Sequence, residues 1–118
     1  MKVLDAENIQ LVSVNNKYTK NRSGRLILTN EYRQFKKTIT TLCKKVKIDK
    51  PYEVKIWFSG RHDIDNCIKP ILDGLQAAGV ISNDKHVYKL NVTKTTGKKT
   101  RLVVEVNTIN MDNNSNKF

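Results

Sequence analysis

Apolar residues along the chain follow two spacings, one typical of strands and one typical of helices. Apolar and polar residues alternate in 53–59 and in 86–94, which predicts strands with one buried face. A third strand is predicted at 101–107, after a TTGKK turn. The segments 9–12 (IQLV) and 25–28 (RLIL) carry weaker strand signals, and the polar stretch between them indicates a loop or a short hairpin.

Two other segments have apolar residues three and four positions apart, the spacing of an amphipathic helix. The first is about 30–47, where Asn30 is a candidate N-cap and the apolar stripe consists of Tyr32, Phe35, Ile39, Leu42 and Val46. The second is 66–78, followed by Gly79 at the position of a C-terminal cap. Pro70 cannot donate a helix hydrogen bond, so we expect the second helix to begin late or to bend near this residue.

The order of these elements is β, β, α, β, α, β, β, which predicts an α+β fold with two helices packed on a small mixed β-sheet. A chain of 118 residues has room for one hydrophobic core, so we expect a single domain over residues 1–108. Residues 109–118 are polar and rich in asparagine, and we expect this tail to be disordered.

The cysteine content and the hydropathy indicate a cytoplasmic protein without a membrane partner. Cys43 and Cys67 both fall in predicted helices, which suits free thiols in a reducing compartment better than a disulfide framework. No apolar run approaches the roughly 20 residues of a membrane span, and the start of the chain has no signal-peptide pattern.

The charge is strongly positive and unevenly distributed. With 22 Lys and Arg against 11 Asp and Glu, the net charge is +11, which predicts a polyanionic partner, nucleic acid ahead of a membrane surface. Residues 17–55 carry twelve basic and three acidic side chains, whereas residues 63–84 carry four aspartates and a single lysine. If the partner is a polyphosphate, carboxylates that face it need a positive intermediary, usually a divalent metal.

The acidic segment is organised around the start of the second helix. Asp63 and Asp65 are two residues apart, so their side chains point the same way if the chain is extended there. Lys69 and Asp73 follow at intervals of one helical turn, and we assume that the helix and the next loop fold back to bring Asp84 beside the start of the helix. Carboxylates without thiolates suit a hard cation such as Mg²⁺, and a lysine beside it can bind a phosphate.

Each of these residues also has a simpler structural interpretation. Asp65 alone can be the N-cap of the helix, and Asp63 can form a surface ion pair with Arg61. Asp84, in a Ser-Asn-Asp sequence, can be a turn former, and a lysine and an aspartate one turn apart make an ordinary helix pair. Spacing alone therefore does not decide between a metal site and a set of caps and turns.

At these residues the chain resembles the RusA family of Holliday-junction resolvases, small endonucleases of phage and prophage origin. The family pattern is D-x-D-N-x-x-K, then an aspartate on the same helix and another in the loop beyond, and it is matched by Asp63, Asp65, Asn66, Lys69, Asp73 and Asp84. The loop 15–18 (NNKY) and the segment 93–106 (TKTTGKKTRLVVEV) are similar to further family segments, so the resemblance extends over most of the chain.

The resemblance implies a role for each residue of the pattern: metal binding and catalysis for Asp63, Asp65 and Asp84, catalysis at the scissile phosphate for Lys69, and support of the site for Asn66 and Asp73. The implied metal is Mg²⁺, with Mn²⁺ as a substitute, and no small-molecule cofactor is expected. Family members are homodimers, and two sites related by a two-fold axis can nick opposed strands of a four-way junction.

Basic residues outside this pattern are candidates for contacts with DNA phosphates: Lys17, Lys20, Arg22, Arg25 and Arg61. Together these features predict a Mg²⁺-dependent, structure-selective endonuclease that resolves Holliday junctions by paired symmetric nicks. Two alternatives stay open, a non-catalytic basic module that binds nucleic acid and a nuclease for other branched DNA.

Overall fold

The computed structural model describes residues 1–110. Within them the chain forms six strands, two α-helices and two short 3-10 helices: β1 (Lys2–Glu7), η1 (Val14–Asn16), β2 (Tyr18–Lys20), β3 (Leu26–Leu28), α1 (Asn30–Leu42), β4 (Tyr52–Ser59), α2 (Ile64–Ala77), η2 (Asp84–His86), β5 (Val87–Thr95) and β6 (Arg101–Thr108). Most of the predicted tail, 109–118, lies outside the described residues, so its disorder stays a prediction.

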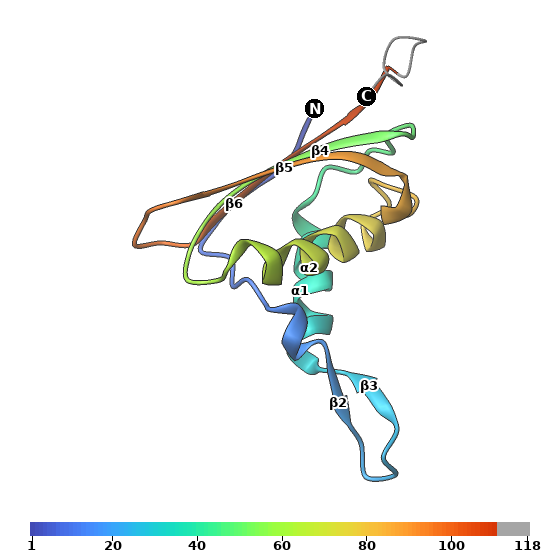
Figure 1. Ribbon diagram of the computed structural model, residues 1–118, viewed down its shortest axis with the longest axis vertical. Helices are drawn as coiled ribbons and strands as arrows, with labels where there is room; N and C mark the ends of the chain where they lie inside the picture. The colour runs from blue at the N-terminus through green and yellow to red at the C-terminus, as the bar shows by residue number, and fades with distance from the viewer. Residues whose placement is uncertain (111–118) are drawn as a thin grey trace.

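Four strands form the main sheet, in the order β1-β6-β4-β5. Strands β4 and β5 are parallel and are joined through α2, while β6 is antiparallel to both β1 and β4. Figure 1 shows α1 and α2 together on one side of this sheet. The predicted α+β fold, a small mixed sheet with two helices packed on it, is confirmed.

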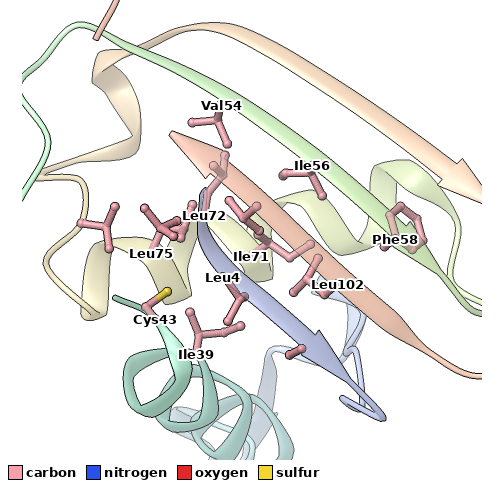
Figure 2. Packing of buried hydrophobic residues seen from close by; sticks show 14 of the residues in the cluster. Leu4, Ile39, Cys43, Val54, Ile56, Phe58, Ile71, Leu72, Leu75 and Leu102 are labelled. Atoms are coloured by element: carbon pink, nitrogen blue, oxygen red, sulfur yellow. The ribbon is translucent and has the colours of Figure 1, made fainter. Parts of the chain in front are cut away.

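The hydrophobic core lies between this sheet and the two helices (Figure 2). Alternate residues of two central strands are buried: Val54, Ile56 and Phe58 in β4, and Leu102, Val104 and Val106 in β6. They belong to one cluster with Ile39 of α1 and with Ile71 and Leu75 of α2. The alternation read from the sequence of β4 is therefore the pattern of burial in the sheet.

The strand expected at 9–12 is wrong, because the first strand lies earlier in the chain. β1 pairs with β6 as far as Glu7. Asn8 then takes a positive φ of 58°, and its N–H donates to the carbonyl of Thr100 at 2.7 Å, which ends the regular pairing. Three of the four residues 9–12 are nevertheless buried, so their apolar character reflects core packing and not strand pairing.

The helix α1 ends at Leu42, about five residues earlier than predicted. Cys43 has an extended backbone with ψ of 148°, and the N–H of Lys44 donates to the carbonyl of Val3 in β1 at 2.8 Å. The chain thus leaves the helix to hydrogen-bond with a strand that is distant in sequence, a contact that helical periodicity does not reveal.

The helix α2 begins at Ile64, so the expectation that Pro70 delays its start is wrong. Pro70 lies inside the helix and is buried, so burial of its ring offsets the loss of one backbone hydrogen bond. The helix stops as predicted: Gly79 has a φ of 79°, and its N–H donates to the carbonyl of Gln76 at 3.1 Å.

The strands β2 and β3 form a separate two-stranded hairpin, which confirms the loop or hairpin expected there. It projects away from the main sheet and the helices (Figure 1). At its base, the N–H of Thr29 donates to the carbonyl of Lys17 at 2.9 Å. At its tip, the side chain of Asn21 accepts hydrogen bonds from the backbone N–H groups of Ser23 and Arg25, each at 3.0 Å.

The state of the two cysteines confirms a further expectation. Cys43 and Cys67 are both buried and free, as predicted for thiols that do not form a disulfide. Within residues 1–110, neither helix combines the length and the apolar character needed to cross a membrane.

Candidate active site

Asp63 and Asp65 lie at the amino end of α2, after the turn that follows β4. Asp63 has the backbone of an N-cap residue (φ −71°, ψ 151°), but its carboxylate makes no capping hydrogen bond. Asp65 lies inside the first turn, so its interpretation as the N-cap is wrong. Both side chains are exposed.

No basic side chain in residues 1–110 forms an ion pair with either carboxylate. Arg61 and Asp63 both lie in this range and do not pair, so the alternative of a surface ion pair between them is wrong. Structural pairing does not explain why two aspartates stand two residues apart at the helix start. Their oxygens are free to bind something from outside the protein.

Lys69 lies one turn beyond Asp65 and is held between two other aspartates. Its ammonium lies 2.9 Å from Oδ1 of Asp73, and it also forms a hydrogen-bonded ion pair with Oδ2 of Asp84. The Lys69 side chain remains 44% exposed. The ammonium is thus fixed by two carboxylates while part of its side chain stays open to solvent.

The loop after α2 folds back onto the helix and brings Asp84 to Lys69, whereas its assumed place was beside the start of the helix. The backbone N–H of Asp84 donates to Oε1 of Gln76 in α2 at 3.3 Å. The preceding residues are fixed by Tyr52, whose hydroxyl accepts the Ser82 N–H at 3.0 Å. Asp84 therefore does more than form a turn, because its side chain contacts the candidate catalytic lysine.

Asp84 and the pair at the helix start are carried by different ends of the β4–β5 strand pair. Strands β4 and β5 are parallel, with Tyr52 opposite Val87 and Ser59 opposite Thr95. Asp63 follows the end of β4, whereas Asp84 precedes the beginning of β5, so the two residues come from opposite ends of this strand pair. In the described part of the chain, no three acidic, histidine or cysteine side chains gather in a group able to hold a metal ion.

Asp73 and Lys69 are both charged near neutral pH because each stabilises the other. Burial alone would raise the pKa of Asp73, but hydrogen bonds from Tyr32, Lys69 and Lys17 lower it below its usual value. Hydrogen bonds to Asp84 and Asp73 raise the pKa of Lys69. The pKa of Tyr32 is raised, first by burial and then by its hydrogen bond to Asp73, so its hydroxyl remains a donor.

The side chains predicted to bind a metal carry the oxygen ligands that a hard divalent cation prefers. Carboxylate oxygens are the preferred ligands of Mg²⁺, and those of Asp63 and Asp65 have no ion-pair partner within residues 1–110. Asp84 has the same chemistry, but its Oδ2 is already paired with Lys69. Asn66 is half-buried beside this pair, and its backbone N–H donates to the carbonyl of Asp63 at 3.2 Å.

The basic residues predicted to contact DNA fall into different environments. Lys20, Arg22 and Arg25 are exposed on the projecting hairpin, where nothing in the described chain neutralises them. Lys17 is different, because its ammonium lies 3.1 Å from Oδ2 of Asp73 and its side chain is only 19% exposed. Lys17 therefore differs from the other three residues, because it is ion-paired and largely buried.

Arg61 lies beside a groove close to the start of α2. The groove has a volume of about 500 Å³ and is lined by residues of the β4–α2 turn and of the β5–β6 turn, among them Arg61, His62 and Lys98. Two basic side chains from turns distant in sequence thus line one depression, where they are available to a phosphate backbone.

Two residues of this region were not predicted as functional from the sequence. Tyr32 was assigned to the apolar stripe of the first helix, but its hydroxyl donates to Oδ2 of Asp73. A buried tyrosine hydroxyl needs a partner, which was the available signal. Lys98 was assigned only to a turn, and its neighbour Lys99 gave the sole hint of a basic surface there.

Comparison with known families places the chain beside a nuclease family. The model of the family described as endodeoxyribonuclease RusA matches residues 8–107 of the chain. The matched range includes the projecting hairpin and all the acidic residues of the candidate site. Comparison with curated proteins gives no match.

Proposed function

We propose a function from one premise: the chain belongs to the RusA family of endodeoxyribonucleases, whose family model matches residues 8–107. The proposed reaction is hydrolysis of phosphodiester bonds in Holliday junctions, by paired symmetric nicks, during DNA recombination and repair. The observation that supports it is a pair of exposed carboxylates, Asp63 and Asp65, which have no ion-pair partner within residues 1–110 and lie at the start of the helix that carries the charged Lys69.

Lys69 is the residue proposed to act on the scissile phosphate. A partly exposed ammonium, already oriented by two carboxylates, can stabilise the negative charge that develops on the phosphoryl oxygens in the transition state. Asp73 supports this role from the buried side of the lysine, and Asn66 supports the helix start. Lys69 thus supplies a fixed positive charge beside the acidic pair.

Asp63 and Asp65 are proposed to bind Mg²⁺, for which Mn²⁺ can substitute, with Asp84 as the third carboxylate. When bound, the cation would supply Lewis-acid polarisation of the phosphate. The chain itself places these carboxylate oxygens at the start of α2, where no side chain of residues 1–110 forms an ion pair with them. Asp84 would contribute the carboxylate oxygen that is not paired with Lys69.

The substrate is proposed to bind as branched DNA along the basic surfaces. Lys20, Arg22 and Arg25 of the hairpin, with Arg61 beside the groove, are positioned for contacts with phosphates, which respond to shape more than to base sequence. A homodimer would present two such sites to the two-fold symmetric junction. The two free, buried thiols are consistent with action in the cytoplasm.

Cleavage of a mobile four-way junction in the presence of Mg²⁺ tests this proposal. The wild-type chain should introduce two symmetric nicks, and Asp63→Asn should bind the junction without cutting it. Asp49→Asn is the matched control, since it removes one exposed carboxylate outside the site. The proposal fails if the wild type binds but never makes paired nicks, or if Asp63→Asn cuts as well as the wild type.

The same assay separates the two alternatives. A non-catalytic binding module would bind the junction with Mg²⁺ present and leave every strand intact. A nuclease for other branched DNA would cut flaps or three-way junctions at least as fast as the four-way junction. Parallel time courses on these substrates, at equal protein concentration, distinguish the three activities.

A further inference from the structure

Asp73 receives hydrogen bonds from three separate parts of the chain. Lys69 reaches it from the same helix, Tyr32 from α1, and Lys17 from the residue before β2. The Asp73 side chain is only 13% exposed. This largely buried carboxylate joins both helices to the base of the hairpin. A shift of the hairpin base or of α1 can therefore change the position of Lys69.

The two oxygens of Asp73 have different partners. Oδ1 faces the Lys69 ammonium at 2.9 Å, while Oδ2 accepts from the Lys17 ammonium at 3.1 Å and from the Tyr32 hydroxyl. Two donors on Oδ2 fix the rotation of the carboxylate and so direct Oδ1 toward Lys69. If either donor is removed, the carboxylate is less restrained and the lysine loses a defined partner.

Lys17 is committed to internal partners, unlike the other basic residues of its segment. Its ammonium lies 5.3 Å from the ring centroids of both Tyr18 and Tyr32, in addition to its ion pair with Asp73. Its backbone carbonyl accepts the N–H of Thr29, which closes the base of the hairpin. Lys17 thus ties the hairpin to Asp73 through both its side chain and its backbone.

We propose that Lys17 and Tyr32 are positioning residues for Lys69, which they orient through Asp73, and that Lys17 is not a contact to DNA. This inference rests on the proposed nuclease function for its role in catalysis. It also links the hairpin, which carries three candidate DNA contacts, to the orientation of the candidate catalytic lysine. The link makes the geometry of the site depend on how the base of the hairpin is held.

Kinetic comparison of Lys17→Met with Lys20→Met tests this inference, because both remove one positive charge from the same segment. Lys17→Met should lower the single-turnover cleavage rate at saturating protein by roughly 10–100-fold, the effect of a slightly misplaced catalytic group. Its dissociation constant for the junction and the salt dependence of binding should stay unchanged. Lys20→Met should weaken binding and reduce the salt slope by about 0.9.

Further variants separate positioning from loss of structure. Tyr32→Phe should lower the single-turnover rate in the same way as Lys17→Met, and Lys17→Arg should restore part of the rate because it keeps the charge and the donor. Lys17→Met combined with Asp73→Asn should be no slower than Asp73→Asn alone, since both act on one carboxylate. Lys37→Met, on the exposed face of α1, controls for the loss of one charge.

A measurement without DNA tests the positioning role independently of the proposed function. In the free protein, NMR relaxation of the Lys69 side-chain methylenes should show greater mobility in Lys17→Met and unchanged mobility in Lys20→Met. The inference is overturned if Lys69 mobility is the same in both variants, or if Lys17→Met reduces the salt slope and leaves the saturated rate intact. If the wild type does not cut junctions, the proposed function fails while the NMR comparison still decides the inference.

Discussion

Gly74 of α2 packs directly against Ile39 of α1. A Cβ atom at position 74 would lie 2.8 Å from Cγ1 and 2.9 Å from Cβ of Ile39, closer than side chains approach without a shift. The absence of a side chain at Gly74 therefore lets the two helices approach at this point. α2 carries Lys69 and Asp73, and α1 carries Tyr32. The contact therefore sets the spacing between the two helices, and with it the separation of Tyr32 from Asp73.

Replacing Gly74 with alanine should destabilise the protein by about 1–3 kcal/mol, the usual cost of excess volume in a packed core. Helix propensity alone predicts the opposite, a gain of roughly 1 kcal/mol in a helix interior. Denaturant unfolding of Gly74→Ala and of the exposed control Gln34→Ala measures the difference. A more stable Gly74→Ala variant would show that the helices are not in close contact here.

The periodic elements of this fold were predictable because local spacing determined them. β4 and the end of α2 at Gly79 appear in the sequence as alternation and as a cap glycine, and both are present. β1 was missed because a register irregularity between Lys2 and Leu4 breaks its alternation. The end of α1 was missed because it depends on a hydrogen bond to Val3, a contact far away in sequence.

The candidate site was predictable in its residues more than in its arrangement. The spacing of Asp63, Asp65 and Lys69 indicated a group of charges at a helix start, which the structure contains. The position of Asp84 depends on how a loop returns after the helix, and sequence spacing does not specify that path. The hydroxyl of Tyr32 signalled that a polar partner was needed, but the sequence does not identify that partner, Asp73, because it lies on the other helix.

Substitution of Tyr52 by phenylalanine should loosen the loop that carries Asp84. The Tyr52 hydroxyl accepts the Ser82 N–H at 3.0 Å and donates to the Ser82 hydroxyl at 3.2 Å, so its removal leaves the backbone N–H without this partner. The expected loss of unfolding free energy is about 1–3 kcal/mol. Faster hydrogen exchange at the Ser82 amide should accompany it.

The exposed Tyr88 provides the control for that experiment. Tyr88→Phe removes the same hydroxyl from a side chain that is 62% exposed, so stability and exchange at Ser82 should stay unchanged. Equal exchange rates at Ser82 in wild type and Tyr52→Phe would contradict the anchoring role of Tyr52.

The two cysteines should react with thiol reagents only after unfolding. Both side chains are buried, and burial raises the pKa of Cys43 to about 11, so little thiolate forms near neutral pH. A chromogenic disulfide reagent should therefore modify neither thiol in the native protein and both in denaturant. Rapid modification of native wild type would disprove this burial, and Thr41→Cys, on the exposed end of α1, is the positive control.

The hairpin arginines should contribute to junction binding through phosphates. Arg22→Gln and Arg25→Gln should each weaken binding and reduce the slope of log K against log salt by about 0.9, additively in the double variant. Fluorescence anisotropy over a salt series measures both quantities. The control Lys37→Gln should leave the slope unchanged, and an unchanged slope in the double arginine variant would exclude the hairpin as a DNA contact.

Neutralising the acidic pair should separate binding from cleavage. Asp63→Asn and Asp65→Asn each remove a negative charge that repels DNA phosphates, while the basic surface is unchanged, so junction affinity in the absence of divalent metal should stay equal or increase. Mg²⁺ binding, measured by calorimetry on the protein alone, should weaken in both variants, and junction cleavage should be lost. Asp49→Asn should change none of these quantities. A large loss of junction affinity in a folded Asp63→Asn protein would mean that this carboxylate orders the DNA-binding surface and does not serve a metal.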